Sequence, residues 1–189
     1  MAKKRKQRTQ QKKRINVGLV VGVMILFGIA IFLLVRSFSG LDSLSNPIAE
    51  GDVAPSFTLA SLTGESVTVP DTTRQATVIF SMAYWCGTCI PEARALTQLQ
   101  EEYGDALRIV LVDMDPSSSP QNLQQFIQAV GPNDLTWTFD PDGEFSRIYG
   151  IRVLDTTIIL NENGREAYRD AYPTSYDTLR TELARIIDL

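Results

Sequence analysis

The chain has 189 residues, 21% of them charged, and a formal net charge of −4, which suits one ordinary domain with short additions. Residues 1–14 hold eight Lys or Arg and no acid. The segment after residue 36 holds nine Arg, no Lys and all 22 acidic residues, a formal charge of −13. Because so acidic a domain repels nucleic acid, the basic head is not interpreted as a nucleic-acid-binding arm.

An uncharged segment follows the basic head. Residues 15–35 contain no charged side chain and only Asn16 as a strongly polar one. As a helix rising about 1.5 Å per residue, these residues span about 31 Å, close to the ~30 Å core of a bilayer. A buried helix of a soluble domain would show one polar face. We therefore expect a transmembrane anchor over residues 15–36.

The charges that flank this segment predict its orientation. Eight positive charges precede it and only Arg36 follows it, which predicts an N-terminus in the cytoplasm and the acidic domain outside the cytoplasmic membrane. A cleaved signal peptide is the alternative, but the apolar stretch exceeds the usual ~7–15 residues and no Ala-x-Ala site follows. We expect a single-pass, uncleaved anchor. Residues 37–52, rich in Ser, Gly, Asn and Pro, form the expected linker to a domain over 53–189.

Hydrophobic periodicity and turn residues predict the elements of this domain. In chain order we expect a hairpin over 57–60 and 66–69, a buried strand over 76–82, a helix over 87–103, a second buried strand over 107–112, a helix over 121–130, a short strand over 136–139, a short helix over 142–149, a hairpin over 156–160 and 166–168, and a last helix over 174–187. This order predicts an α/β domain with a central mixed sheet and helices on both faces.

The only two cysteines, Cys86 and Cys89, form a C-x-x-C pair where the first buried strand meets a helix. A helix N-terminus offers unpaired N–H groups and the positive end of the macrodipole, which favour a thiolate on Cys86. The spacing places Cys89 one turn away, where it can attack a mixed disulfide on Cys86. The pair is therefore expected to cycle between dithiol and disulfide.

A structural role and a metal-binding role are the alternatives to redox chemistry at this pair. An inert structural disulfide suits an oxidising compartment, but it would close so small a loop that it adds little stability. A zinc site needs about four ligands, and the chain has no histidine and no third cysteine. We therefore expect no metal and no cofactor.

The motifs around the pair resemble a known family. The run WCGTC at 85–89, after an apolar strand, resembles the thioredoxin superfamily. GDVAPSFTL at 51–59 with LTGE at 62–65 resembles its membrane-tethered TlpA/ResA-like branch. The similarity covers roughly residues 50–189. It implies a thioredoxin-like fold with an N-terminal hairpin and a central helical insert, supplied by residues 121–149, and extracytoplasmic dithiol–disulfide exchange.

The resemblance also implies roles for single residues. Cys86 is similar to the solvent-facing nucleophile and Cys89 to the resolving thiol. Glu92 falls where this branch often has a glutamate close to the active site, and a carboxylate one turn beyond Cys89 can relay a proton. A solvated glutamate on the helix surface is the alternative. Trp85 is expected to shield the disulfide and to shape the surface that docks clients.

Two positions depart from the family pattern. Asp155 stands where a cis-proline is expected to face the cysteines. A non-proline cis bond costs about 2.5–4 kcal/mol, so we expect a trans peptide here. A carboxylate at this place would raise the pKa of Cys86. Phe80 replaces a residue that is often polar beneath the cysteines, so proton handling is expected to fall to Glu92 or Asp155.

The leading hypothesis is thus a tethered oxidoreductase that exchanges disulfides with extracytoplasmic clients, more often as their reductant. Cytochrome c or copper-site maturation is the client class that the resemblance implies. A membrane electron donor or acceptor would recycle the pair. The alternatives are a non-enzymatic, copper-delivering module and a structural ectodomain. Copper-delivering relatives typically use C-x-x-x-C-Pro with a histidine, and this chain has neither.

Overall fold

A computed structural model of the chain describes residues 51–188. The expected basic head, the anchor and nearly all of the linker lie outside these residues. Within them, no helix is both long enough and apolar enough to cross a membrane. The elements are β1 Phe57–Ser61, β2 Ser66–Val69, β3 Ala76–Met82, α2 Cys89–Tyr103, η2 Gly104–Ala106, β4 Leu107–Asp113, α3 Pro120–Val130, β5 Thr136–Phe139, α4 Glu144–Ile148, β6 Thr156–Asn161, β7 Glu166–Arg169 and α5 Tyr176–Leu183.

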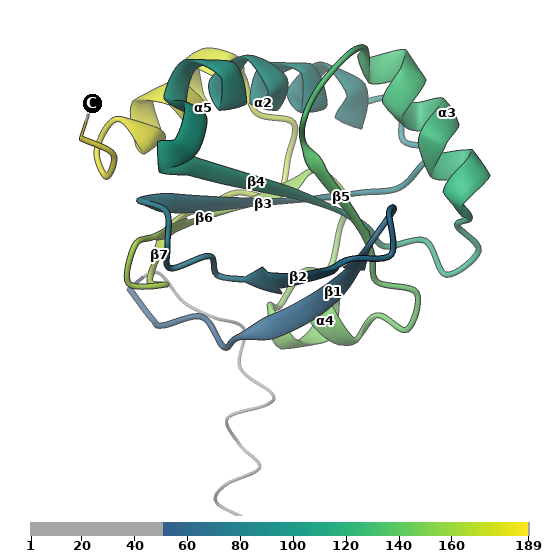
Figure 1. Cartoon of the computed structure of the whole chain (residues 1–189), viewed down its shortest axis with the longest axis horizontal. Coiled ribbons are helices and arrows are strands. Elements are labelled where there is room, and N and C mark those ends of the chain that lie inside the picture. The colour runs from purple at the N-terminus through teal and green to yellow at the C-terminus, as the bar shows by residue number, and fades with distance from the viewer. Residues whose placement is uncertain (1–50, 189) are drawn as a thin grey trace, which may run out of the picture. The chain divides into compact units, whose positions relative to one another are not determined.

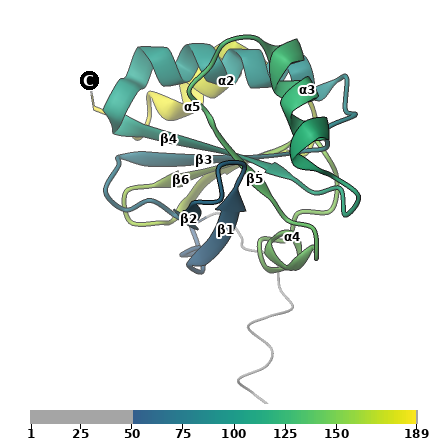
Figure 2. The ribbon, with the colours of Figure 1, turned by 45° about the vertical axis from the view of Figure 1, so that its right-hand side comes forward.

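The strands form one mixed sheet in the order β2-β1-β5-β4-β3-β6-β7. Parallel pairing joins β3 to β4 and β4 to β5, and the remaining neighbours are antiparallel. Helices α2, α3 and α5 cover one face, whereas α4 lies on the other (Figures 1 and 2). The expected α/β class, with helices on both faces of a mixed sheet, is confirmed.

The central strand β3 is buried along its whole length because both of its faces are covered. Successive side chains of a strand point to opposite faces. Phe80 accordingly packs with both cysteines and α2 in one hydrophobic cluster. Its neighbour Ile79 packs in a second cluster with Phe145 of α4. The strand therefore packs against both layers, and the cysteine turn starts from its C-terminal end.

Local signals explain where the helices begin and end. The Ser119 side chain accepts a hydrogen bond from the Asn122 N–H, and Pro120 occupies the first turn of α3, both favoured at a helix start. Helix α2 ends at Tyr103, and Gly104, which follows it, has a φ of 52° that suits glycine. The last helix is shorter than expected, because α5 starts only after the Ser175 cap and ends at Leu183.

The segment expected as a helical insert, residues 121–149, does more than add helices. It contains α3 and α4, but between them β5 enters the sheet and pairs with both β4 and β1. The N-terminal hairpin of β1 and β2 is present as expected. The insert is therefore the link that joins this hairpin to the central strands.

Candidate active site

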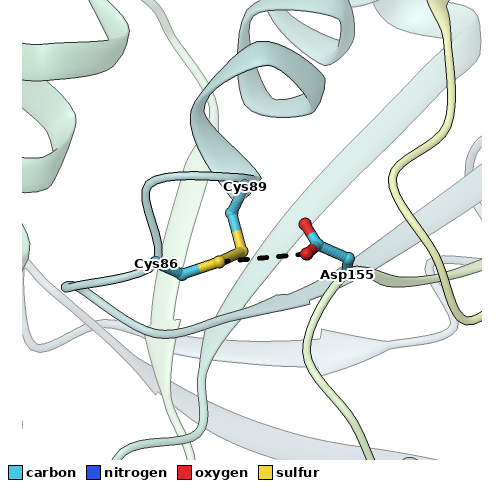
Figure 3. Close-up of side chains that lie close together, drawn as sticks. All are labelled: Cys86, Cys89 and Asp155. Carbon is cyan, nitrogen blue, oxygen red and sulfur yellow. Dashed lines mark hydrogen bonds between the residues drawn. A yellow bond between two sulfur atoms is a disulfide. The ribbon is translucent and has the colours of Figure 1, made fainter.

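The cysteine pair lies in a tight turn between β3 and α2. The Cys86 N–H donates to the Ala83 carbonyl at 2.8 Å, and the Cys89 N–H donates to the Cys86 carbonyl at 3.2 Å. Cys89 is the first residue of α2. The two sulfur atoms form a disulfide, with their Cα atoms 5.4 Å apart (Figure 3). The expected position of a redox pair at a helix N-terminus is thus observed.

The pair is more deeply buried than the sequence indicates. Cys86 is 5% exposed and Cys89 is fully buried, so Cys86 is the outer cysteine but faces little bulk solvent. Cys86 lines a cavity of about 170 Å³ together with Ile90 and Phe126. A depression in the surface therefore lies directly beside the outer cysteine.

Trp85 stands beside the disulfide at the surface, 61% exposed. Its indole N–H donates to Asp115 Oδ2 at 2.5 Å, which holds the ring in one orientation. Trp85 lines both the cavity at Cys86 and a second one of about 290 Å³ that also includes Val153 and Leu154. An exposed aromatic side chain thus lies between two depressions, and its role in docking clients stays a prediction.

Asp155 lies directly against the outer cysteine. Its Oδ2 is 3.9 Å from Cys86 Sγ and accepts a hydrogen bond from the Thr88 hydroxyl at 3.0 Å. The Asp155 N–H donates to the Ser81 carbonyl at 3.0 Å, so β3 holds the loop in place. The only cis peptide within the described residues is Val69–Pro70, which confirms the expected trans bond before Asp155. The carboxylate is therefore an immediate neighbour of the outer sulfur.

Asp155 has two further properties. Its φ of 55° makes it the only non-glycine residue of positive φ within residues 51–188, a conformation that Asp and Asn tolerate better than most residues. It is only 8% exposed, and its Oδ1 is buried without a hydrogen-bond partner. Buried polar atoms are normally satisfied, so this oxygen is an exception.

Glu92 lies one turn after Cys89 and points into the protein, 1% exposed. The Thr157 hydroxyl donates to its Oε1 at 2.5 Å, and the Thr174 N–H donates to its Oε2 at 2.7 Å. The alternative of a solvated surface glutamate is therefore wrong. Because the first turn of α2 rests on β6 and on the loop before α5, this side chain is held between them.

Burial raises the pKa of Glu92 to about 7, since desolvation penalises the charged carboxylate. The hydrogen bonds from Thr157 and Thr174 oppose this shift, while the negative charges of Asp170 and Asp155 add to it. A group with a pKa near 7 can both take up and release a proton at neutral pH. Glu92 is thus suited to exchange a proton with a neighbouring thiol.

Sequence reasoning missed the groups that hold Glu92. Asp170 accepts hydrogen bonds from the Thr157 N–H at 3.1 Å, from the Tyr168 hydroxyl at 2.7 Å and from the Thr174 hydroxyl. These residues lie 65 or more positions beyond Glu92 in the chain, and no motif links them to it. Thr88 was also missed as a partner of Asp155, although its place inside the C-x-x-C motif is a usable signal.

A family model described as Redoxin matches residues 49–183. The chain belongs to the Redoxin family. It is 32% identical over 118 residues to Thioredoxin-like protein YneN of Bacillus subtilis (strain 168), which covers 62% of this chain and 68% of that protein. It is 24% identical over 158 residues to Thiol-disulfide oxidoreductase ResA of the same organism, which covers 82% and 84%.

Solved structures agree with this Redoxin assignment. A putative thiol:disulfide interchange protein DsbE from Chlorobium tepidum matches with a TM-score of 0.65 at 27% identity, over 74% of this chain and 98% of that one. StoA from Bacillus subtilis matches with a TM-score of 0.59 at 22% identity, over 69% and 98%, and shows the shared fold. The expected thioredoxin-like fold and the enzyme class, a thiol–disulfide oxidoreductase, are confirmed.

Proposed function

We propose that this Redoxin-family enzyme is tethered to the cytoplasmic membrane and reduces disulfides of extracytoplasmic client proteins with its Cys86–Cys89 dithiol. The observation that favours a reductant is the Asp155 carboxylate 3.9 Å from Cys86 Sγ. A negative charge there disfavours the Cys86 thiolate. Thiol–disulfide oxidoreductases that are strong oxidants have a stabilised reduced form. A carboxylate that destabilises the reduced form therefore favours the disulfide and lowers the reduction potential.

In the proposed reaction, the Cys86 thiolate attacks one sulfur of a client disulfide and expels the other as a thiolate. The Cys89 thiolate then attacks the Cys86 sulfur in the mixed disulfide. This step forms the Cys86–Cys89 bond and releases the second client thiolate. Two electrons pass from the dithiol to the client, and the two client thiolates take up the two protons that the dithiol gave up.

Glu92 supports the second step. Cys89 is fully buried, so its proton needs an acceptor inside the protein. The Glu92 carboxylate stands one turn away on the same helix, with its pKa raised by burial to about 7. It can receive the Cys89 proton during exchange and return a proton when the pair is reduced again.

The membrane tether is supported by the sequence alone, through the basic residues 1–14 and the uncharged segment that follows. Two of the chain's relatives are named Thiol-disulfide oxidoreductase ResA and Sporulation thiol-disulfide oxidoreductase A. The clients that we propose are apocytochrome c or a copper-site protein, each with an oxidised cysteine pair.

The membrane topology is tested with a reporter enzyme that is active only outside the cytoplasm, fused after residue 189. Activity in whole cells is expected, and an inactive but stable fusion would reject the orientation.

The chemistry is tested with the purified full chain. Insulin reduction in the presence of dithiothreitol measures catalysis, and equilibration with dithiothreitol or glutathione buffers gives the reduction potential. We expect insulin reduction that is lost in Cys86→Ser, and a potential below that of the glutathione pool. An inert structural disulfide would give no insulin reduction. A potential as oxidising as about −120 mV would reverse the proposed direction.

A further inference from the structure

The geometry points to a second state of this site: the reduced Cys86–Cys89 dithiol binds one thiophilic divalent cation, Zn²⁺, with Asp155 as the third protein ligand. A count of cysteines and histidines argues against zinc, but such a count leaves out the Asp155 carboxylate, which the fold places beside the pair. Both cysteine sulfurs and an Asp155 oxygen lie within 4.8 Å of one another (Figure 3).

The distances suit a tetrahedral site. With Zn–S bonds of about 2.3 Å and a Zn–O bond of about 2.0 Å, tetrahedral angles require roughly 3.5 Å between a sulfur and the oxygen and roughly 3.8 Å between the sulfurs. Cys86 Sγ and Asp155 Oδ2 are already 3.9 Å apart. The sulfurs must separate once the disulfide is reduced, since they are then non-bonded atoms. Only small side-chain shifts remain.

The unpartnered oxygen of Asp155 is a second, independent observation that supports a binding site. Asp155 is more than nine-tenths buried, and its Oδ1 has no hydrogen-bond partner in the described part of the chain. Such a group is costly unless something compensates it. A cation held by the Asp155 carboxylate would place positive charge beside this oxygen. The loop also supports the role, because the Thr88 hydroxyl and the Ser81 carbonyl hold Asp155 in place.

The set of donors decides the class of metal. Two thiolates select soft or borderline cations, and one carboxylate with no histidine matches zinc better than copper(II). Three protein ligands leave the fourth position for water. Binding releases the two thiol protons and changes no oxidation state. The metal occupies both sulfurs, so the bound form cannot exchange disulfides, and free Zn²⁺ inhibits the enzyme reversibly.

Metal binding is tested on the full chain, reduced with a phosphine and freed of metal with a chelator. Co²⁺ serves as the spectroscopic probe, and a chromophoric chelator that competes for Zn²⁺ gives the affinity. We expect one Co²⁺ per reduced chain, with sulfur-to-cobalt charge-transfer bands and the visible bands of a tetrahedral ion. The oxidised chain is expected to show neither.

Asp155→Asn isolates the third ligand, because asparagine tolerates the positive φ and keeps the size of the side chain. Zn²⁺ affinity should fall at least about tenfold, since changes beyond the direct ligands alone commonly cost 10–100-fold. Asp142→Asn, which removes the same charge at an exposed loop position, should bind like the parent. Equal affinity in Asp155→Asn, or no Co²⁺ bands in the reduced parent, would overturn the proposal. Insulin reduction measured in chelator tests disulfide exchange separately.

Discussion

The Thr157 hydroxyl on β6 donates a hydrogen bond of 2.5 Å to Oε1 of Glu92 on α2. This contact joins two elements that are far apart in the chain, one turn from the buried sulfur of Cys89. It satisfies a carboxylate that has almost no contact with water. The stability of the fold and the proton chemistry of the cysteine pair therefore depend on the same group.

Glu92→Gln should remove a pH dependence of stability. The pKa of Glu92 rises from 4.5 to about 7 on folding, so the folded state keeps this proton while the unfolded state loses it. Its contribution is fully present below about pH 4.5 and is lost as pH rises through 7. One pKa unit corresponds to about 1.4 kcal/mol. Between pH 4.5 and pH 7, the free energy of unfolding of the parent should therefore fall by roughly 3 kcal/mol relative to that of the Glu92→Gln variant.

This prediction is measured by urea unfolding of the oxidised proteins between pH 4 and pH 8. The glutamine can still accept from the Thr174 N–H with its oxygen and donate to the Thr157 hydroxyl with its amide. Other shifted carboxyls, such as Asp113, whose pKa burial raises, are common to both proteins and cancel in the difference. Parallel curves for the two proteins would show that Glu92 does not titrate in this range.

Asp155→Asn should lower the pKa of the Cys86 thiol. The parent carboxylate is 3.9 Å from Cys86 Sγ, and a like charge at that distance penalises the thiolate. The pH dependence of iodoacetamide alkylation of the reduced chain, in chelator, measures this pKa. Glu92→Gln is the comparison variant. If neither substitution changes the thiol pKa, neither carboxylate tunes the outer sulfur.

Reduction of the disulfide should cost little stability. The bond joins residues only three apart in sequence, and the chain-entropy relation gives about 2 kcal/mol for so short a loop. Urea unfolding with and without a phosphine reductant should therefore show a decrease of about 2 kcal/mol or less. A loss of 4 kcal/mol or more would instead indicate a bond that serves mainly to hold the fold together.

Trp85→Ala should weaken client reduction without unfolding the protein. The side chain is 61% exposed, and such surface changes usually alter stability by about 0.5 kcal/mol or less. As an aromatic anchor beside Cys86, it should carry client binding, with kcat/KM for insulin reduction falling about tenfold, mainly through KM. Tyr172→Ala, at a 63% exposed aromatic that lines neither cavity beside the disulfide, is the control and should retain the parent rate.

Local patterns in the sequence determined much of this protein. The apolar run of β3, the C-x-x-C pair after it and the helical spacing of α2 predict the place of the disulfide, because each signal spans only a few residues. Alignment with the family placed Asp155 opposite the pair, and the hydrogen bond between the Asp155 N–H and the Ser81 carbonyl shows the loop contact that keeps it there. The class of enzyme followed from these features.

Only the tertiary structure decided how the two carboxylates behave. Glu92 occupies a helix position that suits either solvent or core, and its burial depends on how α2 packs on β6 and on the loop at Thr174. Likewise, Asp155 Oδ1 lacks a hydrogen-bond partner within the described residues because no donor lies near enough to it in the folded protein. Burial and charge act through distances between atoms, and residues remote in the chain set these distances. No local pattern carries that information.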